Sequence, residues 1–265
     1  MWLKQPKSNA QIREIWAFSD ERDLEELLKI IAVVIATTAG FTIAGAAGFG
    51  GGVVAIPVLV WVFGVREAIP IFTISQMLSV ATRVWLHRSG INWSVVRNFT
   101  VGGMPFCVLG SLVFVSINTE VLARILGGMM LLILVYTRLP IGRNFNMRLW
   151  GFVPVGSVTG FASGFMGFPG PFAVVFYLAY GLAASSFIGT LSLGMALIQL
   201  PKLVVFGANG LLTPPVLLLG LGLGIIGIGT AYLGKIILRL VPEKVFPWII
   251  TAMLLISGVT LLVHG

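Results

Sequence analysis

The stretch GAAGFGGGVVAIP, residues 45–57, decides how this chain folds. It separates an apolar run at 30–47 from a short apolar run at 53–63, which as a helix covers roughly 16 Å. That is about half of the ~30 Å hydrocarbon core of a bilayer. A chain interrupted at this depth must bury its freed N–H and C=O groups in protein or turn them toward an aqueous cavity. The glycines that permit the break, because they lack a Cβ, are Gly48, Gly50, Gly51 and Gly52.

The second half of the chain repeats this organisation. The segment GFPG, residues 167–170, lies 119 residues after GFGG, residues 48–51, and also precedes a short apolar run. At the same offset, Arg83 falls on Lys202. Two breaks at corresponding places indicate the binding site of a transporter. Close packing of helices through small residues is the alternative interpretation of the same glycines.

Composition places most of the chain in lipid. Apolar residues make up 57% of the sequence and charged residues 10%, with a mean hydropathy of +1.02. Soluble domains carry about 25% charged residues, so a soluble fold could not hide this much apolar surface. The apolar runs fall at 30–47, 53–63, 68–86, 99–117, 121–136, 152–168, 172–180, 187–206, 216–232 and 245–263.

The predicted fold is therefore all-α, a polytopic transmembrane helix bundle of two homologous repeats with helices broken at the glycine-rich motifs. No separate soluble domain fits in the remaining length. The predicted segments are an amphipathic N-terminal tail at 1–29, transmembrane repeat 1 at 30–137, a basic linker at 138–150 and transmembrane repeat 2 at 151–265.

Charge is distributed unevenly along the chain. Residues 30–265 hold twelve basic side chains and only three acidic ones, Glu67, Glu120 and Glu243, so the net charge of +8 on the whole chain comes from the membrane part. This pattern fits loop arginines that obey the positive-inside rule, and it also creates a potential that attracts anions. No basic run or basic–aromatic module indicates nucleic-acid binding. Cys107 stands alone, so neither a disulfide nor a metal site is expected, and no cofactor is predicted.

The candidate substrate site combines the two breaks with polar residues of the third run in each half. Helices that begin just after the breaks would point free N–H groups and a positive dipole end at an anion. Side chains that can donate hydrogen bonds to an anion from within apolar runs add to them. The candidates are Gly50, Gly51, Gly52, Ser75, Gln76, Arg83, Gly167, Gly170, Thr190, Gln199 and Lys202, with Thr73 and Ser192 beside them.

Each group of candidates has a structural alternative. Serine and threonine hydroxyls can bond to their own helix backbone. Arg83 and Lys202 lie near the end of the third run of each half, where they either snorkel to the interface or serve as gate cations on an anion path. No apolar run contains Asp or Glu, which disfavours a proton relay through carboxylates.

Two topologies are open. If each break lies within one crossing, the halves are parallel. If each break is the tip of a re-entrant hairpin, the halves are inverted and the basic loops at 83–97, 138–148 and 235–244 lie together inside. The inverted arrangement places the tail at 1–29, with five basic residues, outside, so counting positive charges does not decide between them.

The motif at 45–57 resembles the glycine-rich first-repeat motif of the sulfite exporter TauE/SafE family of membrane permeases. The second-half stretch SGFMGFPGPFAVVFYLAYGL, residues 163–182, is similar to its counterpart, and so are Thr190-Leu191 and GLLTP at 210–214. The segment from Arg83 through His87-Arg88 to Asn92-Trp93 is similar to the basic loop after the third helix of the first repeat. The resemblance covers about 30–263.

This resemblance implies a multi-pass permease of the cell inner (cytoplasmic) membrane that moves small sulfur-containing or organic anions, such as sulfite, sulfoacetate or other sulfonates. It also implies that Gly50, Gly51, Gly52, Gly167 and Gly170 frame the anion site. The expected partners are the small anionic substrate and membrane lipid, with a homodimer left open. No enzyme is expected, since the two histidines are poorly placed to activate a nucleophile. The alternatives are an anion channel and a non-transporting scaffold subunit.

Overall fold

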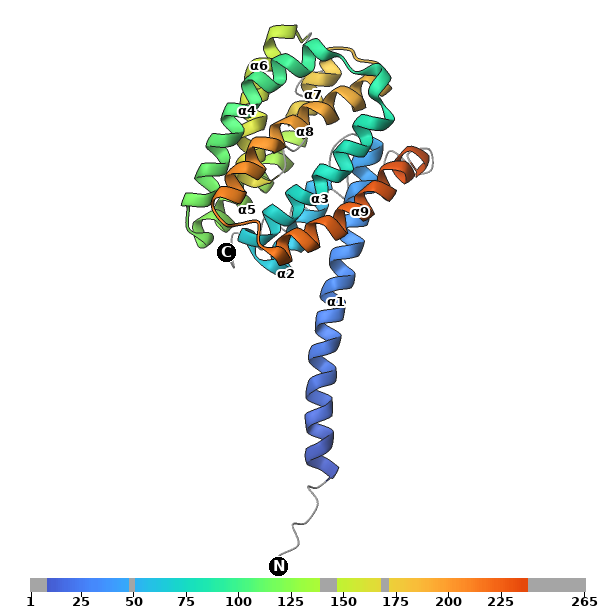
Figure 1. The fold of residues 1–265 in the computed structure, drawn as a ribbon, viewed down its shortest axis with the longest axis vertical. Coiled ribbons are helices and arrows are strands. Elements are labelled where there is room, and N and C mark those ends of the chain that lie inside the picture. The colour runs from blue at the N-terminus through green and yellow to red at the C-terminus, as the bar shows by residue number, and fades with distance from the viewer. Residues whose placement is uncertain (1–8, 48–50, 139–146, 168–171, 238–265) are drawn as a thin grey trace, which may run out of the picture.

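The computed structural model describes residues 9–47, 51–138, 147–167 and 172–237. Within these ranges the chain is helical and contains no β-strand (Figure 1). Two 3-10 turns, Arg88–Gly90 and Leu149–Gly151, precede α4 and α6. The α-helices are α1 (Asn9–Ala47), α2 (Gly51–Phe63), α3 (Val65–Leu86), α4 (Trp93–Ser116), α5 (Thr119–Arg138), α6 (Phe152–Met166), α7 (Phe172–Ala179), α8 (Ala184–Ala208) and α9 (Pro214–Ile237).

Among the described helices, six segments are long and apolar enough to cross a membrane: Leu24–Gly45 of α1, Val65–Leu86, Trp93–Ser116, Leu149–Met166, Ser185–Ala208 and Pro214–Leu233. The helix Gly51–Phe63 is apolar but shorter. Large apolar side chains cover the outside of the bundle, with Leu218 75% and Val204 71% exposed. Such a surface is stable in lipid and not in water. The prediction of an all-α polytopic membrane bundle is confirmed.

The first glycine-rich motif lies at the tip of a helical hairpin. Gly40 of α1 approaches the carbonyl of Gly51 so closely that an added Cβ would lie 2.6 Å from that oxygen. Gly51 in turn lies against Phe41 and Ala44. α2 therefore folds back along α1, and Gly64, with a φ of 73°, turns the chain into α3. Residues 48–50, between the two helices, lie outside the described residues.

The second motif follows the same pattern. α6 ends at Gly167, whose φ of 87° is the left-handed conformation typical of a helix C-terminus. α7 then returns toward the beginning of α6, because the N–H of Met147 donates to the carbonyl of Ala179 over 3.3 Å. Residues 168–171, between α6 and α7 in the sequence, lie outside the described residues. Both breaks predicted from the sequence thus fall between antiparallel helix pairs.

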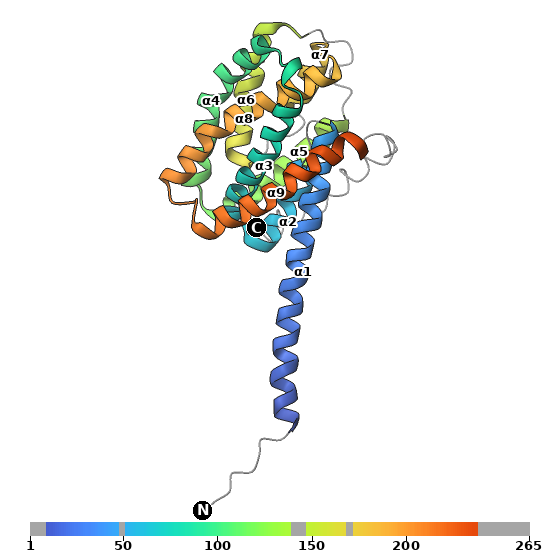
Figure 2. The ribbon, with the colours of Figure 1, turned by 45° about the vertical axis from the view of Figure 1, so that its right-hand side comes forward.

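The two hairpins start from opposite ends of the bundle. The N–H of Asn92, just after α3, donates to the hydroxyl of Thr190 on α8 at 2.9 Å, and His87 lies 3.0 Å from Ser185. α8 therefore begins where α3 ends, and the two helices are antiparallel. Figures 1 and 2 show the result: α7 lies at one end of the bundle, and α1 leaves it at the other. The antiparallel course of α3 and α8 favours the inverted arrangement over the parallel one.

One end of the bundle carries exposed arginines and is called the arginine end: it holds Arg88, Arg97 and Arg148. α4 and α6 both begin there and run in parallel at very close range. An added Cβ at Gly156, Gly160 or Gly164 of α6 would lie 2.0–2.3 Å from a carbonyl oxygen of α4. Small residues at every fourth position allow this approach. Packing through small residues, the alternative proposed for the tip glycines, is therefore what holds α4 against α6.

The fourth helix of each half packs on the other half. α4 contacts α6 and α8, while α9 contacts α1 and α3. In the contact between α9 and α3, Gly220 and Gly224 lie against Ile74 and Leu78. Such an exchange is the arrangement expected of two homologous repeats. The segments 30–137 and 151–265 remain predicted repeats, which this packing favours.

Candidate functional site

A buried cation lies against the tip region of each hairpin. Arg83 of α3 is 2% exposed and donates from Nη1 to the carbonyl of Ala44 over 2.9 Å. Lys202 of α8 is 0% exposed and donates from Nζ to the carbonyls of Ser163 and Gly167, each over 3.2 Å. The last carbonyls of a helix lack intrahelical partners or have spare acceptor capacity, as the Ser163 carbonyl does beside the N–H of Gly167. Each cation therefore caps the first helix of its own hairpin. Arg83 lies 39 residues after Ala44, and Lys202 lies 39 residues after Ser163.

Neither cation snorkels to the interface. Burying an ammonium group costs several kcal/mol unless other groups compensate it, and neutral carbonyls compensate only part of the charge. In the described part of the chain, the ion pairs are Lys29–Glu25 on α1 and Arg124–Glu120 on α5, and no carboxylate pairs with Lys202. Among the described residues, Lys202 therefore carries positive charge into the protein interior that no carboxylate neutralises.

The two cations do not form a single centre. Each lies about 18 residues, or roughly 27 Å, from the start of its own helix. Because α3 and α8 are antiparallel, Arg83 lies near the arginine end and Lys202 near the opposite end. The described glycines have different neighbours: Gly51 packs on α1 at Gly40, Phe41 and Ala44, whereas Gly167 packs on Ile69 of α3 and Ile56 of α2.

The remaining predicted glycines are placed as follows. Gly51 and Gly52 are buried at the first turn of α2, and Gly167 is buried at the end of α6. Gly50 and Gly170 lie outside the described residues. Of the five glycines predicted to frame the anion site, the structure thus describes Gly51 and Gly52 at the first hairpin and Gly167 at the second.

Several predicted hydroxyls are already bonded within the protein. Thr73 donates to the carbonyl of Ile69 over 2.7 Å, and Ser75 donates to that of Phe72 over 2.9 Å. These bonds within one helix are the structural alternative for these two residues. The hydroxyl of Thr190 accepts the N–H of Asn92 and links the two halves.

The two glutamines differ from these hydroxyls. Gln199 is 1% exposed, and both of its amide atoms are buried without a hydrogen-bond partner among the described residues. Within the same ranges, Oε1 of Gln76 is likewise buried and unpartnered. A buried polar group without a partner costs about 1–3 kcal/mol, so each such group in a native structure calls for a partner, which a water molecule, an ion or a ligand can supply.

Other buried hydroxyls without a described partner lie on α6, α7 and α8. Ser163 and Thr159 lie one helical turn apart on α6, and Ser192 lies two turns before Gln199 on α8; all three have a buried hydroxyl with no partner in the described ranges. The same holds for Tyr177 of α7. Analysis of the sequence missed Thr159, Ser163 and Tyr177. Hydroxyls spaced by four residues just before a predicted break were the signal that could have identified the first two.

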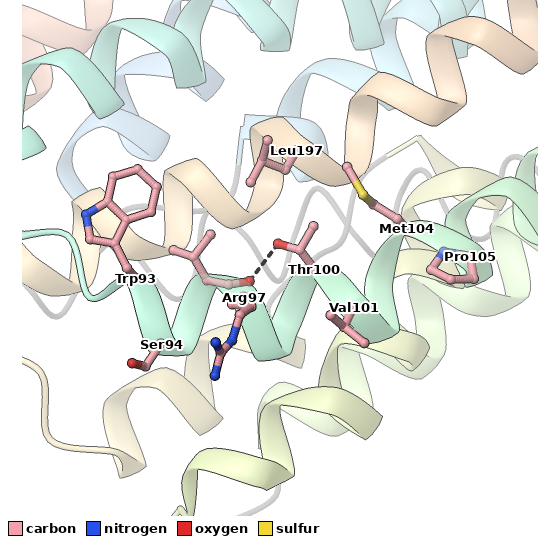
Figure 3. Close-up of a pocket in the computed structure, with 9 residues that line it drawn as sticks. Trp93, Ser94, Arg97, Thr100, Val101, Met104, Pro105 and Leu197 are labelled. Carbon is pink, nitrogen blue, oxygen red and sulfur yellow. Dashed lines mark hydrogen bonds between the residues drawn. The ribbon is translucent and has the colours of Figure 1, made fainter.

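A separate pocket of about 710 Å³ lies between α4 and α8. Figure 3 shows it extending along α4 from Trp93 to Pro105, with Leu197 contributed by α8. None of the predicted site residues lines it, and it involves neither hairpin. Its lining consists of Trp93, Ser94, Val96, Arg97, Thr100, Val101, Met104, Pro105 and Leu197.

Comparison with protein families identifies what this architecture belongs to. A family model described as Sulfite exporter TauE/SafE matches residues 32–261, which include both breaks and both buried cations. The chain belongs to this family. No curated protein and no solved structure matches the chain significantly.

As a TauE/SafE protein, the chain is an integral membrane protein and a permease. Members of the family are transporters rather than enzymes. In the described ranges, no group of three or more His, Cys, Asp or Glu residues could hold a metal ion. The chemistry that the described residues offer is hydrogen-bond donation and positive charge.

Proposed function

We propose that this permease carries small oxyanions of sulfur, namely sulfite or sulfonates such as sulfoacetate, across the cell inner (cytoplasmic) membrane. The observation that carries the proposal is Lys202, a fully buried cation bonded only to carbonyls in the described ranges and accompanied by unpartnered donors on α6 and α8. The family membership supports a sulfur oxyanion as the substrate class.

The donors around Lys202 match the needs of such an anion. A sulfite or sulfonate group offers three oxygens that accept hydrogen bonds. The amide of Gln199 and the hydroxyls of Ser163 and Thr159 supply donors that are already desolvated, and the ammonium of Lys202 supplies the charge. Hydrogen bonds between charged and uncharged partners are stronger than those between neutral groups, so the anion would satisfy several buried groups at once.

Unpartnered groups also occupy the depth between the two cations. Counted by helix rise from the arginine end, Arg83 lies at roughly 6 Å and Lys202 at roughly 27 Å. Ser79 and Ser192 lie at roughly 12 Å, Gln76 at about 17 Å and Gln199 at about 22 Å. α3 and α8 pack on each other, and we propose that the anion passes along their contact between the two hairpins.

The mechanism would be alternating access, in which the hairpins rearrange against the packed helices. The positive-inside rule supports a cytoplasmic location for the arginine end, because the exposed Arg88, Arg97 and Arg148 all lie there. A homodimer stays a prediction that nothing here tests.

Flux through purified protein tests the proposal. Proteoliposomes that contain only this chain should accumulate labelled sulfite or sulfoacetate, whereas protein-free liposomes should not. An excess of unlabelled sulfite should compete, and an equal concentration of acetate should compete at least tenfold less. A scaffold subunit would show no flux, and an anion channel would show a conductance far above carrier rates.

A matched pair of α6 variants tests the site itself. Ser163→Ala removes an unpartnered buried hydroxyl, whereas Ser157→Ala removes one that already donates to the carbonyl of Val153 over 3.1 Å. We expect the first variant to raise the KM for the anion about tenfold and the second to leave it unchanged. Equal KM values for the wild type and the Ser163 variant would remove this hydroxyl from the site.

A further inference from the structure

Three exposed tryptophans mark the level of the lipid headgroups at the arginine end. Trp85, Trp93 and Trp150 are 65%, 68% and 67% exposed, and they lie at the end of α3, the start of α4 and the turn before α6. Arg88 stacks over the ring of Trp85 at 4.0 Å. Tryptophan prefers the membrane–water interface, where its ring meets both headgroups and chains. The mouth of the α4–α8 pocket therefore lies at headgroup depth, since Trp93 forms part of it.

The pocket is polar at this level and apolar further in. Ser94 and Arg97 lie within the first two turns of α4, beside Trp93 (Figure 3). The hydroxyl of Thr100 is already bonded to the carbonyl of Val96 over 2.6 Å. Beyond this point, the lining is formed by Val101, Met104, Pro105 and Leu197. Among the described residues, none that lines the pocket is acidic.

The corresponding contact in the other half is closed. Gly220 and Gly224 of α9 let it pack directly on α3, where added Cβ atoms would lie 2.7–2.9 Å from Ile74 and Leu78. At the offset of 119 residues, these two glycines correspond to Val101 and Pro105, and Leu78 corresponds to Leu197. Val101 and Pro105 of α4 are exposed, and α4 packs on α8 through Gly103 instead, where an added Cβ would lie 2.7 Å from Ile198. At the pocket, the contact between α4 and α8 therefore differs from the corresponding contact between α9 and α3. The difference follows from the residues at these positions of the sequence.

We propose that this pocket binds an anionic phospholipid, with its phosphate at Arg97 and Ser94 and one acyl chain along Val101, Met104 and Leu197. A volume of about 710 Å³ is in the range of pockets that enclose small organic ligands. Lipid tails are as apolar as leucine, so the acyl chain gives position without selectivity. Selection comes from the single cation at the mouth. This site is independent of the transported anion.

Quenching of tryptophan fluorescence tests the proposal directly. The full chain is reconstituted in phosphatidylcholine vesicles, and phosphatidylglycerol with brominated acyl chains is added in increasing proportion. The quenching that disappears in Trp93→Phe reports the lipid beside Trp93. We expect brominated phosphatidylglycerol to half-saturate this signal at about a fivefold lower mole fraction than brominated phosphatidylcholine, the factor that one cation near a phosphate provides.

Two arginine variants separate the pocket from the general charge of this end. Arg97→Gln should raise the half-saturating fraction of phosphatidylglycerol about fivefold, to the value for phosphatidylcholine. Arg88→Gln, which removes the arginine stacked on Trp85 outside the pocket, should leave it unchanged. The proposal is overturned if the two lipids quench equally in the wild type, if Trp93 contributes no quenching, or if the two arginine variants behave alike.

Discussion

Replacing Lys202 by methionine separates a role in transport from a role in stability. Of its two acceptors, the carbonyl of Ser163 also receives the N–H of Gly167 over 3.0 Å, so only the carbonyl of Gly167 loses its described partner. One orphaned buried acceptor costs about 1–3 kcal/mol. The variant no longer buries an ammonium, which relieves several kcal/mol of desolvation. We therefore expect the free energy of unfolding to change by less than about 2 kcal/mol.

Transport by the same variant should fall much further. Removing one partner of a buried charged contact costs about 3–5 kcal/mol, and each 1.4 kcal/mol is a factor of ten in affinity. The KM for sulfite should then rise on the order of 10²- to 10³-fold. Initial rates of labelled sulfite uptake into proteoliposomes give the KM, and thermal unfolding in detergent gives the stability.

Arg124→Met is the matched control, because Arg124 is a surface cation of α5 paired with Glu120 over 2.6 Å. It should change neither KM nor stability appreciably. The reasoning fails if the Lys202 variant unfolds at a much lower temperature but retains the wild-type KM in the protein that remains folded. That result would make Lys202 a helix cap and nothing more.

Three further predictions use the same two measurements or a labelling experiment. Gly160→Ala places a Cβ 2.1 Å from a carbonyl of α4, so it should lower stability by about 1–3 kcal/mol, whereas Gly222→Ala, which has open space around it, should not. Gln199→Leu removes an unpartnered amide and should raise the melting temperature while reducing sulfite uptake at least tenfold. Uptake at the wild-type rate would exclude this glutamine from the site. Labelling of single-cysteine variants tests whether the arginine end is cytoplasmic, because the native Cys107 is buried. An impermeant maleimide added outside intact cells should label Thr213→Cys and spare Ser89→Cys. The reverse pattern would place the arginine end outside.

The breaks were predictable because their cause is local. A glycine-rich motif followed by an apolar run too short to cross the bilayer leaves the chain few ways to satisfy its backbone, and folding back on the preceding helix is one of them. The offset that aligned Arg83 with Lys202 also aligned their acceptors, Ala44 and Ser163, although the sequence alone gave no reason to choose those carbonyls.

The packing partners and the topology were not predictable in the same way. Whether α4 lies on α6 or on a helix of its own half depends on which glycine faces meet, and glycines occur throughout this chain. Counting basic residues left the topology open because the tail carries five of them. The unpartnered state of Gln199 depends on what α6 and α7 place around it, which is a property of the assembled bundle.

The scarcity of carboxylates inside the bundle has a consequence for how an anion can bind and leave. If Lys202 were paired with a buried Asp or Glu, an incoming oxyanion would have to break a charged contact worth about 3–5 kcal/mol before it gained anything. Carbonyls hold the ammonium in place more weakly, at about 1.5–3 kcal/mol for each hydrogen bond, so the empty carrier keeps its cation oriented without neutralising it. The anion then adds a contact rather than exchanging one. Release requires only that the hairpin admits water, because the carbonyls of Ser163 and Gly167 remain to hold the lysine after the anion has gone.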